Sequence, residues 1–209
     1  SGWSFHEVLF IYGFAQIPRG IDHVFTDNLW MLSGQILLQG GFDKYLLRPI
    51  HPLFHLLSER FQPDGFGEIL IGSLLVGYAT FEMGLSISFG KGLLFLFVIF
   101  FATLIYTAIK LAVASIAFWI KFAQSYLYMT YQMSTFTKYP MGIYPKAIRF
   151  MLSFLLPFAF TGYYPGAYFL GKESFLNGVV LTVVVSLVAM VLAYQVWCQG
   201  LKRYESSGS

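Results

Sequence analysis

The chain is poor in cysteine and in charged side chains. Cys198 is its one cysteine, so no intrachain disulfide can form, and a disulfide-stapled secreted domain is excluded. Charged residues make up 11% of the 209 residues, well below the roughly 25% of ordinary soluble domains. The formal net charge of +3 is small and dispersed, which argues against a nucleic-acid-binding surface.

Apolar and aromatic side chains fill the sequence instead. Hydrophobic residues make up 57% of it, the mean hydropathy is +0.66, and there are 23 Phe and 14 Tyr. This composition is typical of an integral membrane protein. Because a helix needs about 20 mainly apolar residues to cross a bilayer, we expect a single all-α domain over residues 1–209 with about five membrane helices. They are residues 7–17 with an extension across Pro18 to residue 25, then 66–88, 93–120, 148–163 and 174–198.

A compact polar stretch, residues 40–54, separates the first two predicted membrane helices. Gly40 and Gly41 permit a sharp turn, and Pro52 favours the start of a short helix, predicted for residues 52–61. His51 is expected to cap that helix. Charged and apolar side chains alternate here, which suits docking of a soluble partner as well as a plain connection between membrane helices. They are Asp43, Lys44, Tyr45, Leu46, Leu47 and Arg48.

Two later segments depart from a plain membrane-spanning pattern. Residues 122–139 place apolar side chains at steps of three and four, which predicts an amphipathic helix packed on the membrane surface or on its neighbours rather than a binding groove. In residues 150–171, prolines and glycines predict a span that breaks into a hairpin dipping back into the outer leaflet. The apolar stripe consists of Phe122, Tyr126, Met129, Met133 and Phe136, and the breaking residues are Pro157, Gly162, Pro165 and Gly166.

The distribution of charge predicts the topology. Residues 121–149 carry four basic residues and no acidic one, and the C-terminal tail carries two basic residues and one acidic one. Because basic loops stay in the cytoplasm, we expect both segments there, and the alternation of spans places residues 40–54 on the same side. The polar residues within 19–27 are expected to mark the exit of the first helix into water. Ser73 and Gly77, four residues apart, are expected to form a small-residue face for helix contact.

Glu82 and Lys110 are the ionisable residues nearest to membrane depth. Exposing a charge to hydrocarbon costs at least ~2.5 kcal/mol, so both are candidates for a transport path. Alternatively, Glu82 reaches the outer interface and Lys110 extends its amine to the cytoplasmic one. Residues 84–91 lack the spacing of an ATP-binding loop, and no catalytic arrangement of side chains stands out.

Several motifs together resemble the permease family of type-2 ABC exporters. They are GFDKYLLRPIHPLF at residues 41–54, YP at 139–140, LPFAF at 156–160 and the terminal GLKRYESSGS. The resemblance implies six membrane helices in the full family fold, so we expect one further helix before Ser1. It also implies that residues 43–57, here called the elbow, are similar to the cytoplasmic coupling helix that engages an ATPase. The implied interface consists of Asp43, Lys44, Leu46, Leu47, Arg48, Pro49, His51 and Pro52.

The same resemblance implies the permease subunit of an ATP-driven exporter. An outer gate is expected from Glu82, Pro157, Tyr163, Tyr164, Pro165 and Gly166. ATP and magnesium would bind a separate ATPase subunit, and this chain would bind no cofactor or metal. The expected partners are that ATPase, a second permease, identical or different, and membrane lipids, in a bacterial inner membrane with the C-terminus in the cytoplasm. A non-transporting membrane scaffold is the alternative, and an integral membrane enzyme is a more distant one.

Overall fold

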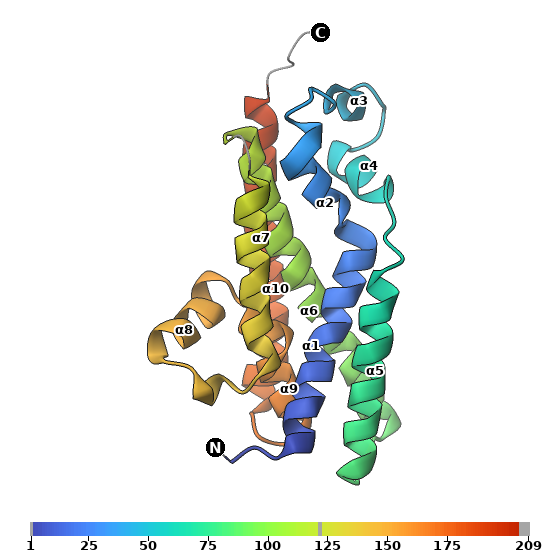
Figure 1. Cartoon of the computed structure of the whole chain (residues 1–209), viewed down its shortest axis with the longest axis vertical. Helices are drawn as coiled ribbons and strands as arrows, with labels where there is room; N and C mark the ends of the chain where they lie inside the picture. The colour runs from blue at the N-terminus through green and yellow to red at the C-terminus, as the bar shows by residue number, and fades with distance from the viewer. Residues whose placement is uncertain (1, 121–122, 205–209) are drawn as a thin grey trace.

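The computed structural model describes residues 2–120 and 123–204, which form an elongated bundle of helices (Figure 1). No strand occurs within these residues, so the all-α prediction is confirmed for them. The long helices run along the bundle, and the shorter α7 lies beside them (Figure 1). They are α1 (Phe5–Thr26), α5 (Gly65–Glu82), α6 (Phe89–Ser115), α7 (Gln124–Met133) and α10 (Leu181–Arg203).

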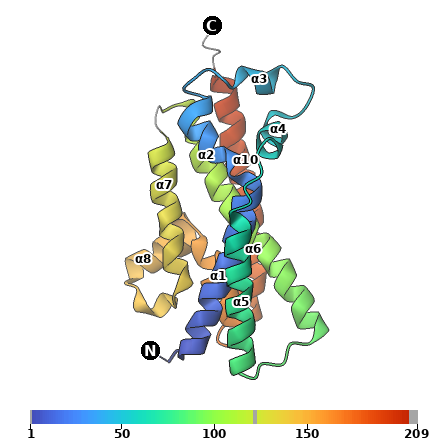
Figure 2. The same ribbon diagram turned by 45° about the vertical axis from the view of Figure 1, so that its right-hand side comes forward.

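Short helices lie at the two ends of the bundle. At one end are α2 (Asn28–Met31), α3 (Asp43–Leu46) and α4 (Pro52–Ser58), together with the C-terminal end of α10 (Figures 1 and 2). Toward the other end are the start of α1, α8 (Lys146–Phe150) and α9 (Tyr163–Phe169). Turns of π-helix cover Leu32–Ile36, Met151–Leu155 and Leu176–Val180, and turns of 3-10 helix cover Ile116–Phe118, Ser134–Lys138, Met141–Ile143 and Phe158–Thr161.

α1 begins at a capping box and continues through Pro18, as predicted. The Glu7 backbone N–H donates to Ser4 Oγ (3.3 Å), and the Ser4 N–H donates to Glu7 Oε2 (2.7 Å). This reciprocal pair satisfies backbone donors that the helix itself cannot satisfy. The helix then runs to Thr26, which makes it long enough to traverse the bundle.

α1 and α5 pack closely because glycines on the two helices face each other. A Cβ atom at Gly13 would lie 2.8 Å from the carbonyl oxygen of Gly72, and one at Gly20 would lie 2.8 Å from that of Gly65. Small residues let membrane helices approach in this way. The prediction that Ser73 and Gly77 form the contact face is wrong, since both are exposed and the glycine face lies a quarter-turn away.

Two segments are long and apolar enough to cross a membrane, Phe89–Phe118 and Leu176–Arg203. They correspond to the spans predicted for residues 93–120 and 174–198. A third candidate is the bent pair of Lys146–Leu155 and Phe158–Phe169. α1 and α5 lie alongside these segments without being as apolar, so the expected number of about five spans stays a prediction.

The charge count predicts that residues 121–149 lie on the cytoplasmic side together with the elbow. The described residues 123–149 instead extend from the elbow end into the opposite half of the bundle. Gln124 lies against Gly34 near the elbow, whereas Lys138 Nζ lies 4.9 Å from the ring centroid of Tyr12, in the opposite half of α1. α7 and the 3-10 turn Ser134–Lys138 therefore lead from the elbow end into the opposite half of the bundle (Figures 1 and 2). Tyr131 of this segment reaches a buried ion pair inside the bundle.

The packing face of this segment matches the predicted stripe only in part, since Met133 and Phe136 pack against the core. Tyr126 and Met129 are exposed, whereas Leu127 is buried in the core beneath the elbow. Phe122 lies outside the described residues. Apolar periodicity alone could not tell the face that packs inward from the face that points outward.

Residues 148–163 do not form one straight helix. The chain bends by 74° between Lys146–Leu155 and Phe158–Phe169, at Pro157, which supports the expected re-entrant shape. The expectation that Pro165 and Gly166 interrupt a helix is wrong, because both lie inside α9. Pro165 is the third residue of that helix, where its missing N–H removes no helical hydrogen bond.

Candidate functional site

The elbow is built by a glycine turn, two short helices and a proline-rich bend. Gly40 has a φ of 68°, a left-handed conformation that favours glycine. α3 follows, and after the bend Pro52 starts α4 as its first residue, as predicted. α4 ends at Ser58, three residues earlier than expected. Gly40 and Pro52 were therefore sufficient to predict the turn and the start of α4.

The elbow is anchored to the C-terminal end of α10. The Tyr204 hydroxyl donates to Asp43 Oδ1 (2.9 Å), and the buried ring of Phe42 lies 5.0 Å from the ring of Tyr204 and 6.0 Å from that of Trp197, centroid to centroid. Burial, and then the Asp43 carboxylate, raise the pKa of Tyr204 to about 12. The phenol therefore remains a hydrogen-bond donor at neutral pH. The elbow and α10 are held as one unit.

A second link fixes the two short helices to each other. Lys44 Nζ lies 2.6 Å from Glu59 Oε1, and the buried Tyr45 donates its hydroxyl to the same carboxylate. Burial opposes ionisation of Glu59, but the hydrogen bonds from Lys44 and Tyr45 outweigh it and lower the pKa of that carboxyl. Glu59 is therefore charged at neutral pH and closes the elbow on itself.

The residues of the implied ATPase interface divide into anchors and exposed side chains. Asp43 and Lys44 hold the elbow in place, as described above. Leu47 is 84% exposed and Leu46 is 46% exposed, although both are large apolar residues. Arg48 and Pro49 are also exposed, with Arg48 Nη1 3.3 Å from His55 Nε2. Exposed apolar side chains beside a cation at the end of a bundle suit a protein partner.

His51 does not cap α4, contrary to expectation. The helix has no side-chain cap, and His51 Nε2 instead lies 3.1 Å from the Tyr194 hydroxyl of α10. His51 thus gives the elbow a further contact with α10, and Pro52, partly buried, sets its direction.

A network of buried charges lies inside the bundle next to the elbow. Lys110 Nζ is 2.7 Å from Asp22 Oδ2 and 3.0 Å from Asp27 Oδ1, and the side chains of Lys110 and Asp22 are fully buried. Tyr131 donates its hydroxyl to Asp22 Oδ2 (3.1 Å), and Thr107 donates to Asp22 Oδ1 (2.9 Å). α1, α6 and α7 are therefore joined through a single carboxylate.

The network continues along α1 to α5. His23 Nε2 lies 3.3 Å from Asp27 Oδ2, and His23 Nδ1 lies 3.8 Å from Glu68 Oε1. Arg19 Nε lies 3.5 Å from Glu68 Oε2. A cavity of about 210 Å³ lies beside these groups, with both signs of charge and aromatic rings in its wall. Arg19, His23, Asp27, Trp30, Tyr128, Tyr131 and Gln132 line it.

This network was not predicted from the sequence. The polar residues within 19–27 were expected at an exit into water, but Asp22 is fully buried. Arg19, His23 and Asp27 are spaced four apart and so share one helix face, and Lys110 in an apolar helix requires a partner of opposite charge. Those two signals together could have indicated a pairing. Only the tertiary structure shows that Asp22 and Asp27 are the partners.

The expected outer-gate residues lie in one part of the chain, with one exception. Tyr164 stacks on Phe160 with ring centroids 4.7 Å apart, and its hydroxyl is 3.3 Å from Ser153 Oγ, so it holds both arms of the bent segment. Tyr163 contacts Trp3 (6.0 Å between ring centroids). Pro165 and Gly166 are buried, Gly166 against Ile11 of α1, and Pro157 marks the bend. Glu82 is exposed at the end of α5, with no ion pair or hydrogen bond of its side chain among the described residues.

Comparison with known proteins identifies the family. The sequence model of the family described as "ABC-2 family transporter protein" matches residues 1–208, almost the whole chain. No match was found among curated proteins or among solved structures. The family consists of membrane components of ABC transporters, in which ATP hydrolysis belongs to an associated ATPase subunit. The helical bundle, its membrane-spanning segments and the sequence match together show that this chain belongs to the ABC-2 family of transporter membrane proteins.

Proposed function

We propose that the chain is the permease subunit of an ABC exporter and that a separate ATPase docks on its elbow. The observation that supports this most is the elbow itself, which presents Leu46, Leu47 and Arg48 to solvent at one end of the bundle while its base is fixed to α10. A plain connecting loop needs neither the anchoring nor the exposed apolar side chains. The ATPase would carry ATP and magnesium.

The anchoring supports a route by which movement of the ATPase reaches the membrane helices. The elbow contacts α10 and its C-terminal end through Asp43 with Tyr204 and His51 with Tyr194, and the adjoining Phe42 contacts Trp197. A rigid short element transmits a displacement that a flexible loop would absorb. We therefore propose that α10 moves with the elbow, and that the buried charge network holds α1, α5, α6 and α7 as the opposing unit.

The bent segment at the far end of the bundle is our proposed outer gate. α9 is followed directly by the helical segment Leu176–Arg203, so a movement of α10 reaches the segment that contains Tyr163 to Gly166. We assign Glu82 no role in the gate beyond its exposed position at the same end of the bundle. We further propose that two permeases pair around the substrate path in a bacterial inner membrane, with elbow and C-terminus in the cytoplasm.

Reversing one exposed charge tests the docking proposal. Replacing Arg48 with Glu should abolish co-purification with the ATPase, because it alters the exposed surface without touching the links to α10. The matched control is Arg149→Glu, the same change on α8 away from the elbow, which should leave co-purification intact. Both variants should insert into membranes. Full association and full ATPase stimulation by the Arg48 variant would refute elbow docking.

A further inference from the structure

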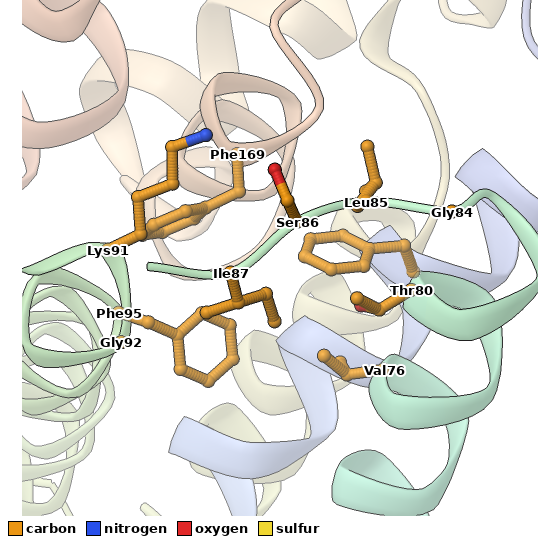
Figure 3. Close-up of a pocket in the computed structure, with 11 residues that line it drawn as sticks. Val76, Thr80, Gly84, Leu85, Ser86, Ile87, Lys91, Gly92, Phe95 and Phe169 are labelled. Atoms are coloured by element: carbon orange, nitrogen blue, oxygen red, sulfur yellow. The ribbon is translucent and has the colours of Figure 1, made fainter. Parts of the chain in front are cut away.

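An apolar pocket of about 300 Å³ lies at the end of the bundle opposite the elbow (Figure 3). The first part of α6 diverges there from α5, and the loop of residues 83–88 joins them (Figure 2). Rings and aliphatic side chains form most of the wall, including the buried Phe10 and Val76. Phe169 of α9 also contributes, so the pocket borders the bent segment. A concave apolar site with a few polar groups is the usual form of a small-ligand site.

One of the polar groups in the wall has no partner. Thr80 is 9% exposed, and its Oγ1 makes no hydrogen bond with any described residue. Its side chain faces the pocket in Figure 3. Buried hydroxyl groups are nearly always hydrogen-bonded, because leaving them unpaired destabilises the fold. The oxygen itself is covered by the wall, so an acceptor oxygen of a ligand would supply the missing partner once the wall shifts to uncover it.

The one charged group in the wall is also unpaired. Lys91 is exposed, and within residues 2–120 and 123–204 its amine has no ion pair or hydrogen bond. Lys110 and Lys172, by contrast, each contact a carboxylate, at 2.7 Å and 2.8 Å. Figure 3 shows Lys91 and Thr80 on opposite sides of the pocket, separated by the rings and Ile87. An anionic group would fit beside Lys91, with an apolar body extending toward Thr80.

We propose that this pocket binds an anionic amphiphile. Its head group would pair with Lys91, its apolar body would lie on Phe95 and Phe169, and an ester or carboxyl oxygen would accept a hydrogen bond from Thr80. Both a membrane phospholipid and a free fatty acid have this chemistry. The inference goes beyond the proposed transport function and does not depend on it, since binding is measured without an ATPase.

Photolabelling of the purified full chain in a non-ionic detergent distinguishes the two sources. The probes are phosphatidylglycerol and lauric acid, each carrying a diazirine in its apolar chain. We expect at least one of them to label residues of the pocket, as mapped by peptide mass spectrometry. Labelling by the phospholipid alone identifies a lipid site, and labelling by laurate identifies a site for free amphiphiles. Labelling spread evenly over the lipid-facing helices by both probes would overturn the proposal.

Charge reversal at the rim tests the head group. Lys91→Glu should reduce pocket labelling by the anionic probe about tenfold, because attraction becomes repulsion. Lys146→Glu makes the same change at an exposed lysine outside the pocket and should have no effect. Equal labelling of the two variants would overturn the role of Lys91.

Two further variants test the body of the site. Thr80→Val keeps the shape but removes the hydroxyl, so labelling should fall several-fold while thermal stability stays the same or rises. A merely structural role for Thr80 predicts loss of stability instead. Gly92→Leu should block labelling, since a Cβ atom at Gly92 would meet nothing within 4 Å and the side chain can enter the pocket. Unchanged labelling of a stable Gly92→Leu protein would refute the assignment of the pocket.

Discussion

At the scale of single residues, the fully buried Lys110 and Asp22 show how an apolar bundle accommodates charge. Neither charge is stable there alone, because burial removes its hydration and only a counter-charge compensates for that loss. The two charges pair with each other, and Thr26, Thr107 and Tyr131 donate hydrogen bonds to the carboxylate. One alternative from the sequence was that Lys110 extends its amine to the cytoplasmic interface. Its pairing with Asp22 and Asp27 explains why it does not.

Removing the amine of Lys110 should destabilise the protein strongly. Lys110→Met keeps the approximate length of the side chain but leaves the buried Asp22 without its cation and Asp27 with His23 alone, and such losses cost about 3–5 kcal/mol. The measurement is the thermal unfolding midpoint in detergent. Lys91→Met, the same substitution at an exposed position of α6, should change it little. The double variant Lys110→Met with Asp22→Asn should recover part of the loss, and no recovery would contradict the pairing as the cause.

At the scale of elements, the elbow and the bent segment depend on different kinds of information. The elbow follows from Gly40 and Pro52, whose conformational limits act locally. The bent segment also contains prolines and glycines, yet Pro165 and Gly166 are helical there, and the chain turns at Pro157 and Gly162 instead. A proline is compatible with the first turn of a helix, so its effect depends on where the helix begins.

Gly162 offers a sharper test of the gate than Pro165. A Cβ atom at Gly162 would lie 2.8 Å from both Ala15 Cβ and the carbonyl oxygen of Thr137, so Gly162→Val should push the bent segment away from α1 and from the 3-10 turn Ser134–Lys138. We expect reduced transport after reconstitution with the ATPase, and unchanged ATPase association, because the elbow is at the other end. Gly142→Val, where a Cβ atom meets nothing, is the control. Normal transport by the Gly162 variant would argue against a gate in this segment.

At the scale of the whole molecule, the arrangement of the ends predicts the topology. The elbow and the end of α10 lie at one end, and α9 lies at the other (Figure 1). If the elbow end is cytoplasmic, single cysteines at Lys44 and Lys202 in a Cys198→Ser background should resist an impermeant thiol reagent added outside intact cells. A cysteine at Lys146 should react, although the charge count placed it in the cytoplasm. Labelling at Lys44 or Lys202 would reverse the assignment.

The sequence by itself determined the membrane character, the all-α class and the local form of the elbow. Apolar content decides whether a segment can enter lipid, and Gly40 and Pro52 restrict the backbone wherever they occur. These properties need no knowledge of neighbours, which is why residues 93–120 and 174–198 were recognised nearly in full.

Only the tertiary structure decided which polar residues are paired and which remain open. Asp22 and Asp27 lie 88 and 83 positions before Lys110, and Thr80 and Lys91 come to face one pocket through the packing of α1, α5, α6 and α9. From the sequence alone, where its partner is not known, a charged side chain such as Asp22 is expected to lie in water. In the structure its partner Lys110 is present, and the side chain is buried. Long-range pairing of this kind leaves no periodic trace in the sequence, because the energy of a buried charge depends on the surroundings that the fold provides.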